Sequence, residues 1–251
     1  MKLGFASCSV LFSFVAVMPP VIAADQGSIP KPVNRIARSA TIQIQTPASP
    51  GSAVVIKSSP DSCVVITAFH VVEPIKGQEY GDLVFFGGAS LRLKPEMISR
   101  VQNTDFALLR VPAACPISQV AVLGNPNDVQ IGDIVYVAGF SANISPEVNA
   151  PSYRVISGPI LSISEQRDGY SLTYDVRTVS GMSGGPIFAS NGTLIGLHGR
   201  GETLANTGEK VAAMGMSVRL ARESAAGPAG DIGPMRLLQP LRLSPCPGVV
   251  C

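Results

Sequence analysis

The chain of 251 residues has only two histidines, His70 and His198, and they lie far apart in the sequence. Protein metal centres are usually built from clusters of such residues. The sequence therefore gives no reason to expect a metal, and it indicates no cofactor. The scarcity also limits the choice of a proton-accepting side chain, a task that histidine performs most often.

The chain also lacks an excess of charge of either sign, with 19 basic and 17 acidic residues. Loss of Lys2 with the N-terminal segment described below makes the two counts nearly equal. Binding to nucleic acid or to an anionic membrane relies on a strongly basic surface. We therefore expect no nucleic-acid partner, and we expect a monomer.

The N-terminus carries an apolar run from Leu3 to Met18, and the small residues Ala23 and Ala24 follow soon after it. This order is typical of a secretory signal peptide and its cleavage site. The run is shorter than the roughly 20 apolar residues of a membrane-spanning helix. We interpret residues 1–24 as a cleaved signal peptide rather than an anchor, which predicts a secreted or periplasmic protein without stable membrane insertion.

Long amphipathic helices are absent. Between residues 41 and 218 the chain consists of short β-branched runs separated by Gly, Pro, Asn and Asp. Such runs at regular spacing are typical of an all-β barrel protein. The expected strands are Thr41–Gln45, Val54–Ile56, Cys63–Thr67, Leu83–Phe86, Phe106–Val111, Ile134–Phe140, Tyr153–Ile156, Ile160–Ile163, Leu172–Val176, Thr193–Leu197 and Ala212–Val218.

A stretch rich in Pro, Asn and Gly, from Cys115 to Asp133, separates two groups of strands. We interpret it as the crossing from a first barrel, about 36–118, to a second, about 119–220. Residues 25–35 would form a propeptide or an N-terminal arm. Residues 221–251, rich in Pro and Gly, would form a loosely packed tail.

One serine stands between glycines in the segment GMSGGP, residues 181–186, which is typical of a turn that exposes a hydroxyl and backbone amides. A serine hydroxyl is a weak nucleophile and needs a base, and the base needs an orienting group. His70 ends one strand-like run and Asp105 precedes another. Taken singly, His70 could be a buried structural residue and Asp105 a turn residue.

Three segments together resemble the catalytic segments of chymotrypsin-like serine proteases: TAFH at 67–70, DFALL at 105–109 and GMSGGP at 181–186. The resemblance implies two six-stranded antiparallel β-barrels with the active site in the cleft between them. It also implies an endopeptidase that cleaves proteins or peptides through an acyl-enzyme. Ser183 would attack, His70 would take its proton, and Asp105 would orient His70. The amides of Gly181 and Ser183 would form the oxyanion hole.

Two alternatives come from other classes of protein. The serine segment also fits the Gly-x-Ser-x-Gly motif of α/β-hydrolases, in which the acid and the histidine follow the serine. His198 is the only later histidine and lies fifteen residues on, too close for the intervening β/α units, so an esterase is disfavoured. A catalytically silent peptide-binding protein on the same fold is the second alternative, against which an intact triad argues.

His198 ends an apolar run and is either a barrel-wall residue or part of a substrate pocket. The segment IGLH, residues 195–198, resembles the glutamyl endopeptidase branch of the same family, where this histidine lines the specificity pocket. Thr178, five residues before Ser183, matches a second contact to the substrate carboxylate in that branch. The resemblance implies cleavage after Glu or Asp, with another specificity as the alternative.

Other residues near the serine bear on specificity and activation. Arg177 stands where trypsin has an acidic residue, and it either enters the pocket or is a solvated charge. Gly199, Arg200 and Gly201 would pair with the substrate main chain by strand addition. Met182 replaces the aspartate of the digestive enzymes, so activation by insertion of a new N-terminus is not expected.

Four cysteines remain once Cys8 leaves with the signal peptide. An even number in an exported chain permits disulfides, and free buried thiols are the less favoured alternative. We favour Cys63 with Cys115, because each flanks a strand that would carry a catalytic residue. Cys246 and Cys251 would then form a small loop near the C-terminus.

Overall fold

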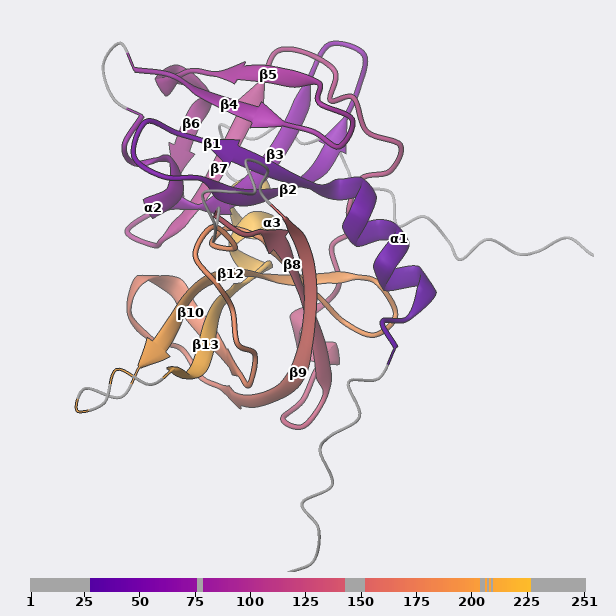
Figure 1. Ribbon diagram of the computed structural model, residues 1–251, viewed down its shortest axis with the longest axis vertical. Coiled ribbons are helices and arrows are strands. Elements are labelled where there is room, and N and C mark those ends of the chain that lie inside the picture. Colours follow the sequence, from indigo (N-terminus) through magenta and orange to yellow (C-terminus); the bar gives the residue numbers. More distant parts are fainter. Residues whose placement is uncertain are drawn as a thin grey trace, which may run out of the picture.

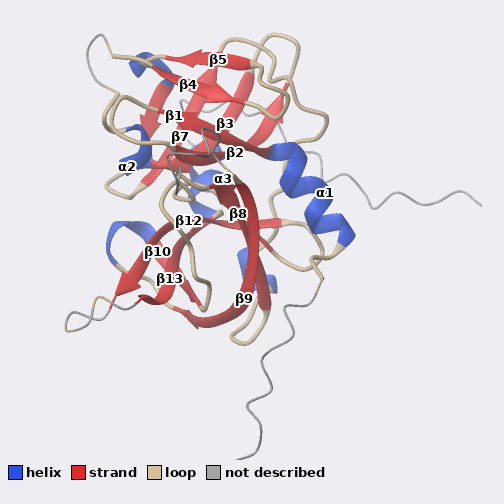
Figure 2. Ribbon diagram, in the orientation of Figure 1, coloured by secondary structure: helices blue, strands red, loops and turns tan. Residues whose placement is uncertain are grey.

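The computed structural model describes residues 28–75, 79–142, 152–203, 206, 208 and 210–226. The expected signal peptide and the expected pairing of Cys246 with Cys251 lie outside these residues. The described chain folds into two β units, the earlier one above the later one in Figure 1. Strands predominate and helices are few, as Figure 2 shows. The predicted all-β fold of two antiparallel barrels is confirmed.

The first unit is a seven-stranded antiparallel sheet in the order β5-β4-β1-β2-β3-β7-β6. Its edge strands β5 and β6 are short and do not pair with each other in the described chain. Pro95, which has no N–H, opens a 3₁₀ turn between them. The sequence predicts six strands for this barrel, and the structure has seven. Because β5 and β6 do not pair, hydrogen bonds do not close the described sheet into a complete ring. The strands are β1 (Thr41–Gln45), β2 (Gly51–Ser58), β3 (Cys63–Ala68), β4 (Gly81–Val84), β5 (Ser90–Leu93), β6 (Ile98–Arg100) and β7 (Phe106–Val111).

The second unit is a closed barrel in the order β10-β13-β12-β11-β8-β9. Its core consists of apolar side chains that alternate inward along these strands, among them Val137, Ile187 and Ile195. Closure leaves no strand edge exposed, which is how barrels avoid edge pairing. The strands are β8 (Ile134–Phe140), β9 (Tyr153–Ile163), β10 (Tyr170–Tyr174), β11 (Pro186–Phe188), β12 (Leu194–Thr203) and β13 (Lys210–Ser217).

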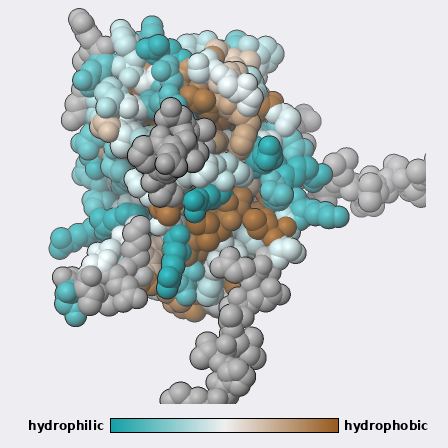
Figure 3. Space-filling model, in the orientation of Figure 1, coloured by the Kyte–Doolittle hydropathy of each residue, from teal (hydrophilic) through white to brown (hydrophobic). Residues whose placement is uncertain are grey.

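Helix α1 (Lys31–Ala40) contacts both units, through β1 and β2 on one side and β11 on the other. It buries Val33, Ala37 and Ala40 along one face, at the spacing of an amphipathic helix. Its outer face is hydrophilic, the teal surface at the right of Figure 3. The helix spans residue 36, the expected first residue of the protease domain.

The other α-helices among the described residues are α2 (Phe69–Val72), which follows β3, and α3 (Arg219–Ala226), which follows β13. None of the helices in the described residues is long and apolar enough to cross a membrane.

A disulfide joins Cys63, the first residue of β3, to Cys115, with their Cα atoms 5.5 Å apart. It closes a loop of 52 residues that contains both β3 and β7. In the chain-entropy model, a loop of this length stabilises the fold by about 4 kcal/mol. Both cysteines are buried, so the disulfide lies within the core of the first unit.

Candidate active site

His70 and Asp105 are neighbours because of the register between two antiparallel strands. Ala68, the last residue of β3, pairs with Phe106, the first residue of β7. The residue that follows β3 therefore lies beside the residue that precedes β7. Helix α2 begins there, and the N–H of Phe69 donates to the backbone oxygen of Asp105 at 2.8 Å.

The carboxylate of Asp105 holds His70 at two points. Its Oδ1 accepts a hydrogen bond from the backbone N–H of His70 at 2.8 Å, and its Oδ2 lies 2.8 Å from the ring Nδ1. An ionised carboxylate only accepts hydrogen bonds, so Nδ1 carries the proton. The neutral ring then keeps a lone pair on Nε2. The His70 side chain is 43% exposed and that of Asp105 only 14%, so the imidazole faces solvent while the carboxylate lies inside.

Asp105 has two further partners, both from the second barrel. Tyr170, the first residue of β10, donates its hydroxyl to Asp105 Oδ2 at 2.7 Å. The N–H of Asp105 donates to the backbone oxygen of Asp168 at 2.7 Å. Burial raises the pKa of Asp105, but the hydrogen bonds and charge of His70 and the hydrogen bond from Tyr170 outweigh it. The pKa of this carboxyl therefore lies below its ordinary value.

The turn that carries Ser183 requires glycine at several positions. Gly181 and Gly184 have φ values of +92° and +81°, in the left-handed region that favours glycine. A Cβ on Gly184 would lie 2.1 Å from Thr67 Oγ1 and 2.2 Å from the backbone oxygen of Ser52. Only glycine allows this turn to approach the first barrel so closely.

Two peptide planes in this turn have fixed orientations. The backbone oxygen of Ser180 accepts from the N–H of Ala142 at 2.7 Å, and that of Met182 accepts from the N–H of Gly185 at 3.0 Å. In a trans peptide the N–H points away from the C=O. The N–H groups of Gly181 and Ser183 therefore point away from these partners. Neither is a donor in any hydrogen bond between described residues.

Ser52 of β2 ties the same turn to the first barrel. Its hydroxyl donates to the backbone oxygen of Gly181 and accepts from the N–H of Phe140, both at 2.8 Å. Its own N–H donates to the backbone oxygen of Ser183 at 2.8 Å. Met182, which lies between Gly181 and Ser183 in the sequence, is completely buried. Hydrogen bonds and apolar packing thus hold this turn in place.

The hydroxyl of Ser183 donates to the backbone oxygen of Gly199 at 2.9 Å. The hydrogen bonds of the described residues include none between Ser183 and His70. A serine hydroxyl moves between staggered rotamers, and nucleophile and base are often not yet in contact before substrate binds. The structure thus brings His70 and Asp105 together, with Ser183 turned toward Gly199.

The residues expected to bind substrate differ in burial. Thr178 and His198 are buried, and His198 Nδ1 lies 2.7 Å from the hydroxyl of Tyr174. Arg177 is exposed after the end of β10. Gly199, Arg200 and Gly201 lie on β12, paired with β13. These strand residues form the wall of the second barrel next to Ser183.

Arg200 is exposed, and its guanidinium lies over the ring of Tyr170, 4.6 Å from the ring centre. Such a cation–π contact holds the side chain against the barrel surface. Arg200 therefore contacts the tyrosine that binds Asp105. Neither Tyr170 nor Tyr174 was among the residues expected from the sequence, because no motif marks them.

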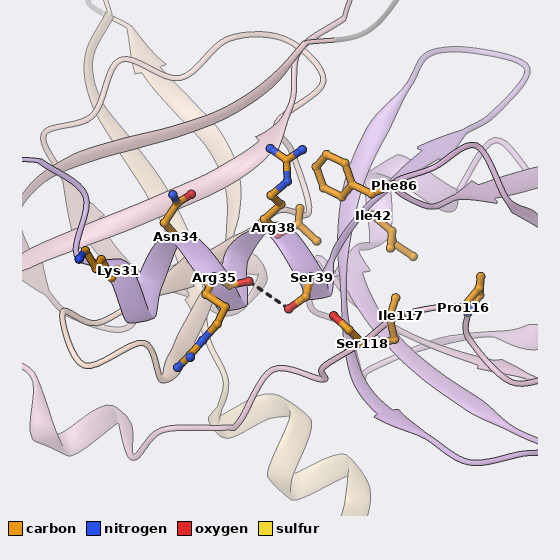
Figure 4. Close-up of a pocket in the computed structure, with 11 residues that line it drawn as sticks. Lys31, Asn34, Arg35, Arg38, Ser39, Ile42, Phe86, Pro116, Ile117 and Ser118 are labelled. Carbon is orange, nitrogen blue, oxygen red and sulfur yellow. Dashed lines mark hydrogen bonds between the residues drawn. The ribbon is translucent and has the colours of Figure 1, made fainter.

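A cavity of about 560 Å³ lies away from these residues, between α1 and the first sheet. Lys31, Arg35, Arg38 and Phe86 are among its lining residues. Figure 4 shows Arg35 and Arg38 pointing in opposite directions, and Arg38 lies over the ring of Phe86. The cations therefore do not converge on one point as they would around a bound anion.

Comparison with known proteins places the chain among peptidases. A family model described as a trypsin-like peptidase domain matches residues 51–197. The magnetosome formation protease MamE of Paramagnetospirillum magneticum is 33% identical over 111 residues, which are 43% of this chain and 15% of MamE. The chain thus spans only a small part of that relative.

Two solved structures have the same fold. One is an HtrA-type protease, AlgW, with a tripeptide (TM-score 0.58, 21% identity, 76% of this chain and 60% of that chain). The other is a serine endoprotease from Yersinia pestis (TM-score 0.58, 20% identity, 76% and 63%). The likeness confirms the chymotrypsin-like double barrel. Because the family model covers more than half of the chain, from β2 into β12, the chain belongs to the trypsin-like peptidase family.

Proposed function

We propose that the chain is a serine endopeptidase in which Ser183 is the nucleophile, His70 the general base and Asp105 the residue that orients the base. The observation that carries the proposal is the double hydrogen bond from His70 to the carboxylate of Asp105, at 2.8 Å for each contact. It fixes the tautomer in which Nε2 can accept a proton. Family membership adds a protein or peptide as the substrate.

The proposed reaction begins when the hydroxyl of Ser183 leaves the backbone oxygen of Gly199 and turns to Nε2 of His70. His70 takes the proton as Ser183 attacks the scissile carbonyl, and later gives it to the leaving amine. The N–H groups of Gly181 and Ser183 would bind the developing oxyanion. Such a donor can lower the barrier by about 3 to 4 kcal/mol. Water then releases the acyl group.

The test is Ser183→Ala, with Ser190→Ala as the control because Ser190 is exposed in the turn after β11. We expect Ser183→Ala to lose peptide hydrolysis and labelling by a fluorophosphonate probe while its melting temperature stays near that of the wild type. Ser190→Ala should keep both activities. A wild-type protein that binds peptides without hydrolysis or labelling would instead support the silent binding protein.

We further propose that the enzyme cleaves after Glu or Asp, with Thr178 and His198 as contacts to the acidic side chain. Burial, followed by the charge of Tyr170, raises the pKa of Tyr174 well above its ordinary value, so its hydroxyl stays protonated. Its only hydrogen bond among the described residues joins it to His198 Nδ1. With Tyr174 as the donor, His198 would carry its own proton on Nε2, the form that donates a hydrogen bond from that nitrogen.

The specificity proposal predicts that His198→Leu lowers kcat/KM for a substrate with Glu before the cut by about 10- to 100-fold, because a hydrogen bond to a charged group is lost. The matching substrate with Gln should be affected much less. Arg177→Gln is the comparison variant, because it removes an exposed charge near the same site instead of a buried side chain. Cleavage of a peptide library after small apolar residues would contradict the proposal.

Export to an oxidising compartment, secreted or periplasmic, is also proposed. The support is the Cys63–Cys115 disulfide, because disulfides persist mainly outside the cytosol. N-terminal sequencing of the protein recovered from culture medium or periplasm tests this. A start near residue 25 is expected, and retention of the intact chain in the cytosol would contradict it.

A further inference from the structure

Tyr170 links the two barrels at the carboxylate of Asp105. Its hydroxyl and Nδ1 of His70 bind the same oxygen, Oδ2, at 2.7 and 2.8 Å. Tyr170 comes from β10 of the second barrel, whereas Asp105 and His70 come from the first. The residue is 2% exposed, so this hydrogen bond is shielded from solvent.

The surroundings of Tyr170 fix its ring in this position. A Cβ on Gly199 would lie 2.3 Å from both Cε1 and the hydroxyl oxygen of Tyr170. The absence of a side chain at Gly199 therefore provides the space that the phenol occupies. On another side, the guanidinium of Arg200 lies 4.6 Å from the ring centre. Two consecutive residues of β12 thus hold the ring.

The turn before Tyr170 binds the backbone of the same aspartate. The oxygen of Asp168 accepts the N–H of Asp105 at 2.7 Å, and Asp168 itself has a φ of 60°. A non-glycine residue in this region is uncommon and is maintained by its surroundings. One segment of the second barrel, residues 168–170, therefore contacts both the backbone and the side chain of Asp105.

The phenol is suited to remain a donor. Burial raises the pKa of Tyr170 well above its ordinary value, and the hydrogen bond to Asp105 and the charge of that carboxylate raise it further. Tyr170 therefore keeps its proton wherever the enzyme could work. Without the phenol, Oδ2 would lose the contact that sets its direction relative to the ring of His70.

We propose that Tyr170 is a positioning residue: it orients the Asp105 carboxylate from the opposite barrel, so that the His70–Asp105 pair is correctly aligned only when the barrels are docked. This inference rests on the proposed function. It adds a residue that contacts neither the substrate nor the reacting atoms and that acts through Asp105.

The experiment compares Tyr170→Phe with Tyr136→Phe. Each removes one hydroxyl from a buried tyrosine of the second barrel, and Tyr136 makes no side-chain hydrogen bond among the described residues. We expect Tyr170→Phe to lower kcat by about 10- to 100-fold, the loss that follows from removal of a hydrogen bond to a charged group. KM should change less than about twofold, since substrate contacts are intact. Tyr136→Phe should retain the wild-type kcat.

A second readout does not depend on turnover. The Nδ1 proton of His70, recorded by NMR, should change its chemical shift in Tyr170→Phe and not in Tyr136→Phe. If kcat and this resonance are unchanged in Tyr170→Phe while Ser183→Ala is inactive, the role of Tyr170 is refuted and the proposed function stands. If the wild type neither hydrolyses peptides nor reacts with a fluorophosphonate, the proposed function fails and the positioning role fails with it.

Discussion

Single hydroxyl groups hold the backbone of the candidate site in place. Ser52 contributes its hydroxyl to two buried backbone groups, the oxygen of Gly181 and the N–H of Phe140. A buried polar group that loses its hydrogen-bond partner destabilises the fold, because it has given up its hydrogen bonds to water and has no replacement. The serine therefore stabilises the turn that bears the two amides proposed for the oxyanion hole, and it does so from the other barrel.

Removal of that hydroxyl should affect both stability and rate. We expect Ser52→Ala to lower the free energy of unfolding by roughly 2 to 4 kcal/mol, because two buried groups are left unsatisfied. It should also lower kcat more than it changes KM. Urea unfolding and peptide hydrolysis measure the two effects. Ser90→Ala, at an exposed position of β5, should change neither, and equal behaviour of the two variants would contradict this role of Ser52.

At the scale of elements, the β-branched runs predict most strands correctly. The ends of β1, β7 and β8 agree with expectation, because each run is bounded by polar or turn-forming residues. β9 is one strand where two were expected, since Gly158 and Pro159 suggest a break. In the folded protein Gly158 is needed within the strand, because a Cβ there would lie 1.8 Å from the backbone oxygen of Asp175.

Other elements have no signal of this kind. β5, β6 and β11 are three or four residues long, too short for an alternating pattern to be recognised. Helix α1 has a clear apolar face, but its first half falls within residues 25–35, for which the sequence predicts a propeptide or an N-terminal arm. Its burial against both barrels is a tertiary effect that local propensity does not contain.

The residues of the candidate site also fall into two groups, those that the sequence predicts and those that it does not. Local motifs predict His70, Asp105 and Ser183, because each lies in a short segment of recognisable composition. Tyr170 and Ser52 contact partners 65 and 129 positions away. Only the folded barrels bring these residues together, so no pattern within a segment could identify them.

At the scale of the whole molecule, the site depends on how the two barrels dock. Ser52 and Thr67 of the first barrel contact the turn of Ser183, and Tyr170 of the second contacts Asp105. Each barrel thus completes the part of the site that the other carries. This mutual dependence makes the ionisation of Asp105 a property of the assembled fold.

The stability of the fold should therefore depend on pH through Asp105. Its folded pKa lies below the value of the unfolded chain, about 3.9, so the ionised carboxylate stabilises the fold above that pH. This stability is lost as the pH falls through the folded pKa. Asp105→Asn should be less stable than the wild type by on the order of 1 to 3 kcal/mol near pH 6, and the difference should shrink below about pH 4.

Urea unfolding of both proteins at several pH values measures this difference. Asp82→Asn is a suitable control, because Asp82 is paired with Arg92 in a more exposed position on β4. A difference between wild type and Asp105→Asn that stays constant from pH 6 to pH 3 would show that the carboxylate is not selectively stabilised in its ionised form.

The central claim is that Ser183 is a nucleophile activated by His70 and Asp105. Its most direct test is mass spectrometry of the wild-type protein after reaction with a fluorophosphonate probe. The account predicts a single adduct on the peptide that contains Ser183, formed much more slowly in a His70→Ala variant. No adduct, or an adduct at another serine, would contradict it.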